Sequence, residues 1–190
     1  MRHFGKTNTC KDQTGFTIIE LLIVLVLIGL LAYALTPIVN SQIVKINVPS
    51  VAGDVNSYVI ARKTAGEQSD DGDKYAGLTQ TSFANAMYRT HLKVANGSTI
   101  VKHTLGGGDA GVLTIAETGT EMTLTGSKMS EAACPEFVTQ VQLNASKVTL
   151  NGTTVKASDD NNNLTTPYSV NKAQAACSKG DTNEVVFTFN

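Results

Sequence analysis

An uninterrupted apolar segment near the N-terminus restricts what this chain can become more than any other feature. Residues 16–36 contain a single charged side chain, Glu20. As a helix with a rise of about 1.5 Å per residue, the segment is roughly 30 Å long, which matches the hydrocarbon thickness of a bilayer. A charge inside a membrane segment costs on the order of 2.5–3.5 kcal/mol on insertion scales. Glu20 is therefore expected to have both a partner and a role.

The flank before this segment predicts its orientation. Residues 1–15 are polar and carry three basic side chains and one acidic side chain. Basic flanks stay on the cytoplasmic side, so the N-terminus is expected inside. A secretory signal peptide fits less well, because its apolar region is usually about 7–15 residues long and a cleavage site follows it. The nearest small-residue pair, Ala32 and Ala34, lies within the apolar run. An ordinary signal anchor stays open, although it would not explain Glu20.

The rest of the chain is long enough for one modest globular domain. The whole chain of 190 residues has a net charge of −1 and contains no tryptophan. Because a nucleic-acid footprint needs a basic domain, we predict no direct nucleic-acid binding.

The cysteines divide between the two sides of the apolar segment. Cys10 precedes it, and Cys134 and Cys177 follow far behind it. If the segment spans a membrane, the later pair lies in the compartment where disulfides persist, which predicts a Cys134–Cys177 bond. Two unpaired thiols in an intracellular protein are the alternative.

Hydrophobic periodicity predicts an α+β head built on a long helix. Apolar positions recur at helical spacing from Val44 to Val59, so we predict that the helix continues to about Thr64. Pro49 and Gly53 are expected to kink or loosen it.

Beyond this helix the pattern alternates with period two. It predicts an antiparallel sheet of about 4–6 strands laid over the helix, with the last strand interior to the sheet. The expected strands are 98–105, 112–118, 121–126, two strands within 148–156 around Asn151-Gly152, and 184–190; further helices are expected within 81–92, 128–143 and 171–177.

No group of residues predicts catalysis or metal binding. Asp70, Asp71 and Asp73 resemble a calcium loop only faintly, and a solvated turn is favoured. The glycines at 106–108 lack the following Lys-Ser/Thr of a phosphate loop, which favours a hairpin turn. His91 is expected near the end of a short helix, where an imidazolium complements the helix dipole, and is assigned no other role. His103 is expected on a strand with no partner acid or cysteine nearby. We therefore predict no enzyme, no cofactor and no metal.

The sequence Gly15-Phe16-Thr17-Ile18-Ile19-Glu20-Leu21 resembles the class III signal of type IV prepilins. The resemblance implies that a prepilin peptidase cuts between Gly15 and Phe16 and that Phe16 is then N-methylated. It also implies a helix kink at Pro37. The implied organisation is a leader at 1–15, a helix at 16–64 whose part 16–36 is the transmembrane and fibre-core segment, and a globular pilin head at 65–190 with a disulfide-bounded region at 134–177.

The cut would give Glu20 a partner. The new amine on Phe16 lies close to Glu20, and in a bundle of apolar helices Glu20 of one subunit can reach the amine of its neighbour. Such a pair offsets the burial of the charge and sets the axial register. A glutamate that reaches back to the interface is the simpler alternative.

The C-terminal part is similar to type IVb pilins, with a cysteine on each of two helices, a hairpin at Asn151-Gly152 and an apolar last strand. Phe16, in contrast, is the first residue typical of type IVa pilins. The family implies the pilin fold and a homopolymeric helical filament used for adhesion, aggregation, motility, or DNA and mating contact. It implies storage in the bacterial inner membrane, with membrane lipid and the pilus assembly machinery as partners. The alternative is a minor pilin or a type II secretion pseudopilin.

Overall fold

The computed structural model describes residues 15–68, 73–159, 161 and 163–190, and the side chains of 37 and 38 are not part of that description. Residues 1–14 of the predicted leader, Cys10, Asp70 and Asp71 lie outside the described residues. The chain divides into two compact units, Met1–Ile38 and Val39–Asn190, which are described separately below. We refer to the second unit as the head.

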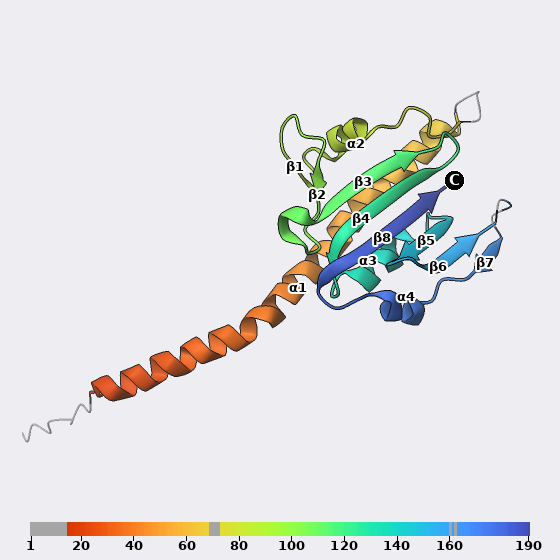
Figure 1. The fold of residues 1–190 in the computed structure, drawn as a ribbon. Helices are drawn as coiled ribbons and strands as arrows, with labels where there is room; N and C mark the ends of the chain where they lie inside the picture. Colours follow the sequence, from red (N-terminus) through yellow and green to blue (C-terminus); the bar gives the residue numbers. More distant parts are fainter. Residues whose placement is uncertain (1–14, 69–72, 160, 162) are drawn as a thin grey trace, which may run out of the picture. The chain divides into compact units, whose positions relative to one another are not determined.

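Helix α1 runs without interruption from Ile18 to Gly66 and therefore ends close to the predicted Thr64 (Figure 1). Pro49 and Gly53 lie within this continuous helix, and the kink expected at Pro49 stays a prediction. In the head, one stripe of α1 is buried at helical spacing, and it confirms the predicted face. Its fully buried side chains are Val48, Val51, Ala52, Val55 and Val59.

The head contains an antiparallel sheet with the order β1-β2-β3-β4-β8-β5-β6-β7 among the described residues. The α+β class and the antiparallel pairing are confirmed, whereas the prediction of 4–6 strands was too low. The two strands outside the predicted runs, β1 and β7, have only two and three residues, too few for a period of two to show. The strands are β1 Lys93–Val94, β2 Val101–Lys102, β3 Val112–Glu117, β4 Met122–Ser130, β5 Lys147–Leu150, β6 Thr153–Ser158, β7 Leu164–Thr166 and β8 Asp181–Phe189.

The last strand lies inside the sheet, as its apolar sequence predicted. β8 pairs with β4 on one side and with β5 on the other. The described part of the head also contains three short helices: α2 Gln80–Met87, α3 Cys134–Val141 and α4 Val170–Ala176. A 3-10 turn, η1, covers Gly108–Ala110.

The helix predicted within 128–143 is confirmed, but it begins later than the pattern from Lys128 indicated. Residues 128–130 continue β4, where Met129 pairs with Asn183 and Ser130 with Asp181 of β8. α3 begins only at Cys134, with Pro135 in its first turn, where proline has no hydrogen bond to lose. Pairing with a strand about 50 residues away therefore outweighs the local helical pattern.

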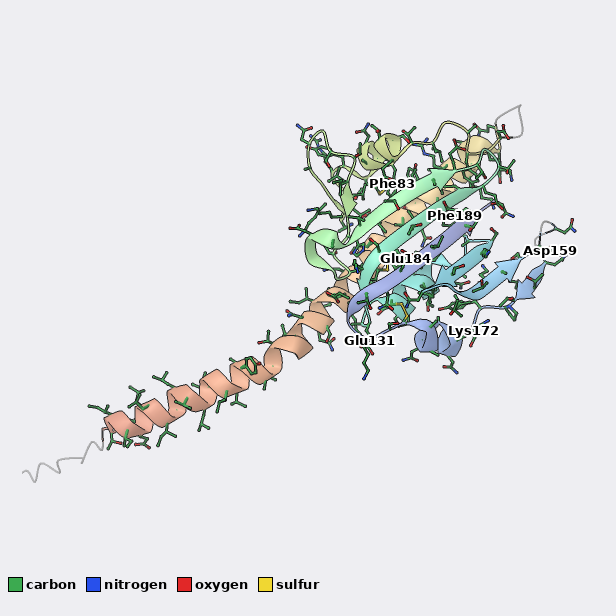
Figure 2. All side chains as sticks on the ribbon, in the orientation of Figure 1. Phe83, Glu131, Asp159, Lys172, Glu184 and Phe189 are labelled. Atoms are coloured by element: carbon green, nitrogen blue, oxygen red, sulfur yellow. A yellow bond between two sulfur atoms is a disulfide. The ribbon has the colours of Figure 1, made fainter. Side chains whose placement is uncertain are left out.

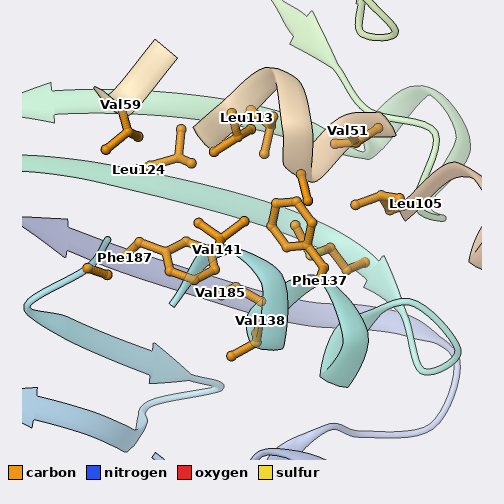
Figure 3. Packing of buried hydrophobic residues seen from close by; sticks show 14 of the residues in the cluster. Val51, Val59, Leu105, Leu113, Leu124, Phe137, Val138, Val141, Val185 and Phe187 are labelled. Atoms are coloured by element: carbon orange, nitrogen blue, oxygen red, sulfur yellow. The ribbon is translucent and has the colours of Figure 1, made fainter. Parts of the chain in front are cut away.

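One hydrophobic core joins α1, α3 and the sheet (Figure 3). Figure 3 shows Val51 and Val59 of α1, Leu113 and Leu124 of the sheet, and Phe137 of α3 in this core. The ring of Phe137 meets that of Phe187 edge to face, with centroids 5.8 Å apart. The head thus holds the C-terminal half of α1 in place by this packing, together with hydrogen bonds to Asn56 and Asp54 of the helix.

Candidate functional site: the N-terminal segment and the disulfide region

The first turn of α1 is held by a side-chain cap. The hydroxyl of Thr17 accepts a hydrogen bond from the backbone N–H of Glu20 at 3.3 Å, and the Thr17 carbonyl accepts one from Leu21. Thr17-x-x-Glu20 has the spacing of a capping box, and an acidic side chain in the first turn complements the helix dipole. This role of Thr17 was not predicted, although its spacing from Glu20 in the sequence is that of a capping box.

The apolar half of α1 is exposed on every side. Phe16 is 78% exposed, and the leucines, isoleucines and valines from 18 to 35 are 41–82% exposed. Figure 2 shows these side chains projecting all round this part of the helix. Along one stripe Ile19, Leu22, Ile23, Val26 and Leu27 line a shallow, purely apolar groove. Length and hydropathy qualify α1 as a membrane-spanning helix, with a mean hydropathy of 2.9 and no buried share in its most apolar window.

The predicted processing and assembly residues lie together at the start of this segment. Gly15 and Phe16 are exposed and precede the helix, and Glu20 is exposed in its first turn. A Cβ atom at Gly15 would meet nothing within 4 Å, so packing gives no reason for a glycine there. The backbone at Pro37 belongs to α1, and the kink predicted there remains a prediction.

Cys134 and Cys177 form the disulfide that the sequence predicted, with Cα atoms 6.2 Å apart. Cys134 is the first residue of α3, and Cys177 caps the end of α4 with its N–H on the carbonyl of Ala173. The bond therefore joins the start of α3 to the end of α4. It closes the chain over 43 residues.

A buried asparagine fixes the loop that follows Cys177. Asn183 is fully buried on β8. Its Nδ2 donates to the carbonyls of Met129 at 3.1 Å and Ser178 at 2.9 Å, and its Oδ1 accepts from Asn151 Nδ2 at 2.8 Å and from the N–H of Ser178 at 2.6 Å. This one amide thus links β4, the Asn151 turn and the loop after α4. Nothing in the local sequence distinguishes it from the other asparagines.

Neither histidine of the head is in a catalytic arrangement. His91 Nδ1 pairs with Asp54 at 3.1 Å on the surface, whereas the side chain of His103 is buried between Ser127 and Leu105. Burial lowers the pKa of His103, because the imidazolium form would be desolvated, although the Ser127 carbonyl opposes the shift. The described residues contain no group of His, Cys, Asp and Glu that could hold a metal ion. Each histidine therefore links two segments of the head, His91 through its pair with Asp54 and His103 through its hydrogen bond to Ser127.

Two family models match this chain, one at its N-terminal end and one over most of the head. Residues 10–35 match the prokaryotic N-terminal methylation motif, and residues 74–190 match the family model described as PilS N terminal. The crystal structure of TcpA, a type IV pilin from Vibrio cholerae El Tor biotype, matches with 13% identity and a TM-score of 0.44, covering 76% of this chain and 99% of that one. No curated protein matches the chain.

Proposed function

The chain belongs to the PilS family and is a type IV pilin, a subunit of a pilus, and we propose that prepilin peptidase cuts it between Gly15 and Phe16 before it polymerises. The methylation motif supports this cleavage and the N-methylation of Phe16. The pilin family consists of structural proteins. The proposed product is therefore a helical surface fibre built from many copies of this chain.

The exposed apolar half of α1 is the observation that carries the proposal. Burying one Leu, Ile or Val side chain contributes about 1.5–3 kcal/mol, so this many exposed side chains cannot stay in water. Two apolar environments can bury these side chains. Lipid surrounds the segment in the inner membrane before assembly, with the N-terminus on the cytoplasmic side, and the apolar helices of neighbouring subunits surround it afterwards.

Glu20 gives the assembly its register. In the fibre its carboxylate pairs with the methylated amine of Phe16 on a neighbouring subunit, and the Thr17 cap holds the first turn in which Glu20 lies. A buried charge that loses its partner costs about 3–5 kcal/mol. Each misplaced subunit would therefore leave such a charge unpaired, which selects one axial position.

Replacement of Glu20 tests this mechanism. Glu20→Ala is expected to reduce the chain recovered in sheared surface fibres at least tenfold while leaving the membrane pool intact. Asn171→Ala, at an exposed uncharged position on α4 of the head, is the control and should assemble as wild type. Normal fibres from Glu20→Ala would refute the pairing. Mass spectrometry of the fibres should give a methylated Phe16 as the first residue, and any other N-terminus would refute the cleavage site.

The presence of Glu20 favours a major subunit over the alternative of a minor pilin or a pseudopilin, because its pairing allows a subunit to add anywhere along the fibre. Imaging a strain that lacks only this chain distinguishes the two. Complete loss of fibres identifies the major subunit, whereas a few remaining fibres of normal width identify a minor one. The resemblance to the type IVb subclass stays a prediction.

A further inference from the structure

A basic pocket of about 280 Å³ opens on the head where the end of α1 approaches the loop after α3 and the strands β6 and β7. Lys63 of α1 and Lys156 of β6 both line it, together with Asn144, Ser146 and Ser158. Among the described residues, no aspartate or glutamate lines the pocket. Its side chains therefore offer positive charge and neutral hydrogen-bonding groups.

Lys156 lacks a counterion among the described residues. It is only 9% exposed, and its Nζ donates to the carbonyl of Gln142 at the C-terminal end of α3. An ammonium group has three N–H donors, and this is the only bond shown for it within the described part of the chain.

The ion pairs among the described residues are His91–Asp54 and Lys102–Asp109, so neither Lys63 nor Lys156 is paired. Asn190 also lines the pocket, and no ion pair between it and either lysine is found among the described residues. Burial lowers the pKa of Lys156, as expected for an ammonium removed from water without an anion. A carboxylate in the pocket would compensate this burial.

The rim of the pocket shows what kind of molecule would bring that carboxylate. Leu143 and Leu164 both line the pocket and are 74% and 59% exposed, among the large apolar side chains of the head that face solvent. A free, hydrated anion gains nothing from two leucines. A protein surface that carries a carboxylate can cover both leucines, and the exclusion of water around the pocket strengthens the interaction between the carboxylate and the lysines.

We propose that this pocket receives an Asp or Glu side chain from the head of a neighbouring copy of the same chain in the fibre. The inference rests on the proposed function, because a fibre places copies of the chain against one another. Head-to-tail packing joins two different faces of the subunit, so the carboxylate comes from a face other than the pocket. Acidic side chains outnumber basic ones in residues 39–190. The head therefore has carboxylates that are not matched by its own basic side chains and can bind in the pocket of a neighbour.

Carbodiimide coupling within intact fibres tests the proposal directly, since it joins a carboxylate to an amine only when they are in contact. Wild-type fibres are expected to yield covalent dimers whose joined peptides contain Lys63 or Lys156 and an Asp or Glu. Lys63→Arg and Lys156→Arg together keep both charges but remove both reactive amines. This variant should form normal fibres and lose those dimers. Dimers without these lysines, or coupling of these lysines only within a single chain, would overturn the proposal.

Charge reversal gives an independent measurement. Lys63→Glu is expected to lower the yield of fibres at least tenfold, with the thermal unfolding of the membrane-extracted chain unchanged. Lys172→Glu is the matched control. The pocket is lined by Asn190, which directly follows Phe189 at the end of β8, and Lys172 lies on α4, away from Phe189 (Figure 2). Wild-type yield from Lys63→Glu would overturn this inference alone. A wild-type chain absent from any fibre would overturn the proposed function as well.

Discussion

Replacement of Asn183 by alanine is expected to destabilise the head by about 3 kcal/mol. The amide makes four hydrogen bonds of 3.1 Å or shorter, to Met129, Ser178 twice and Asn151. A net contribution of about 0.5–1.5 kcal/mol for each gives about 2–6 kcal/mol in total. Ser178 is exposed and can bond to water instead, so the lower half of that range applies. For a domain of this size, the loss corresponds to a decrease in Tm of about 6–12 °C.

Asn183→Asp is expected to replace two hydrogen bonds to carbonyl oxygens by repulsion between a carboxylate and those oxygens. The carboxylate would replace an N–H donor that now faces the carbonyl oxygens of Met129 and Ser178. Repulsion and burial would raise the folded-state pKa of the new carboxyl above its unfolded value of about 3.9. A raised pKa makes the folded state bind the proton more tightly, so the variant is most stable below about pH 4 and loses stability as the pH rises. We expect it to be less stable than Asn183→Ala at pH 7 and more stable at pH 4.

Thermal unfolding of the full chain in detergent, followed by near-ultraviolet circular dichroism, measures both effects. Asn171→Ala is the control, because Asn171 is exposed on α4 and its side chain forms no hydrogen bond shown within the described residues. It should change the free energy of unfolding by no more than about 0.5 kcal/mol. A similarly small effect of Asn183→Ala, or equal losses for Asn183→Asp at both pH values, would refute the reasoning.

Two further predictions concern the head. Reduction of the Cys134–Cys177 bond, which closes the chain over 43 residues, should lower the free energy of unfolding by about 4 kcal/mol, measured as a shifted guanidinium midpoint; an unchanged midpoint would contradict it. His103 has a lowered folded-state pKa, so the unfolded chain binds its proton first as the pH falls. Stability should therefore decrease by up to about 1.4 kcal/mol per pH unit below roughly pH 6.5, and His103→Gln should flatten that profile. Parallel urea-midpoint profiles for wild type and His103→Gln between pH 7.5 and 5 would show that another group is responsible.

The N-terminal segment could be predicted from the sequence because its properties are local. The apolar run, the single acid at Glu20 and the residues around Gly15 are consecutive, and a helix requires only neighbours within four positions. The Cys134–Cys177 disulfide could be predicted because a membrane segment places both cysteines in the compartment where disulfides persist. The continuation of α1 could be predicted from the helical spacing of apolar residues from Val44 to Val59. In each case the relevant information lies within a short stretch or depends on which side of the membrane a residue occupies.

The tertiary structure decided what depends on contacts between distant residues. The placement of β8 between β4 and β5 extends β4 to Ser130, where the local pattern indicated a helix. The same placement buries Asn183 among groups 5, 32 and 54 residues away. The burial of Lys156 beside Lys63 likewise depends on how β6 packs against the end of α1. Strand pairing and the burial of polar groups are set by loop closure and packing across the whole head, and no local period in the sequence records them.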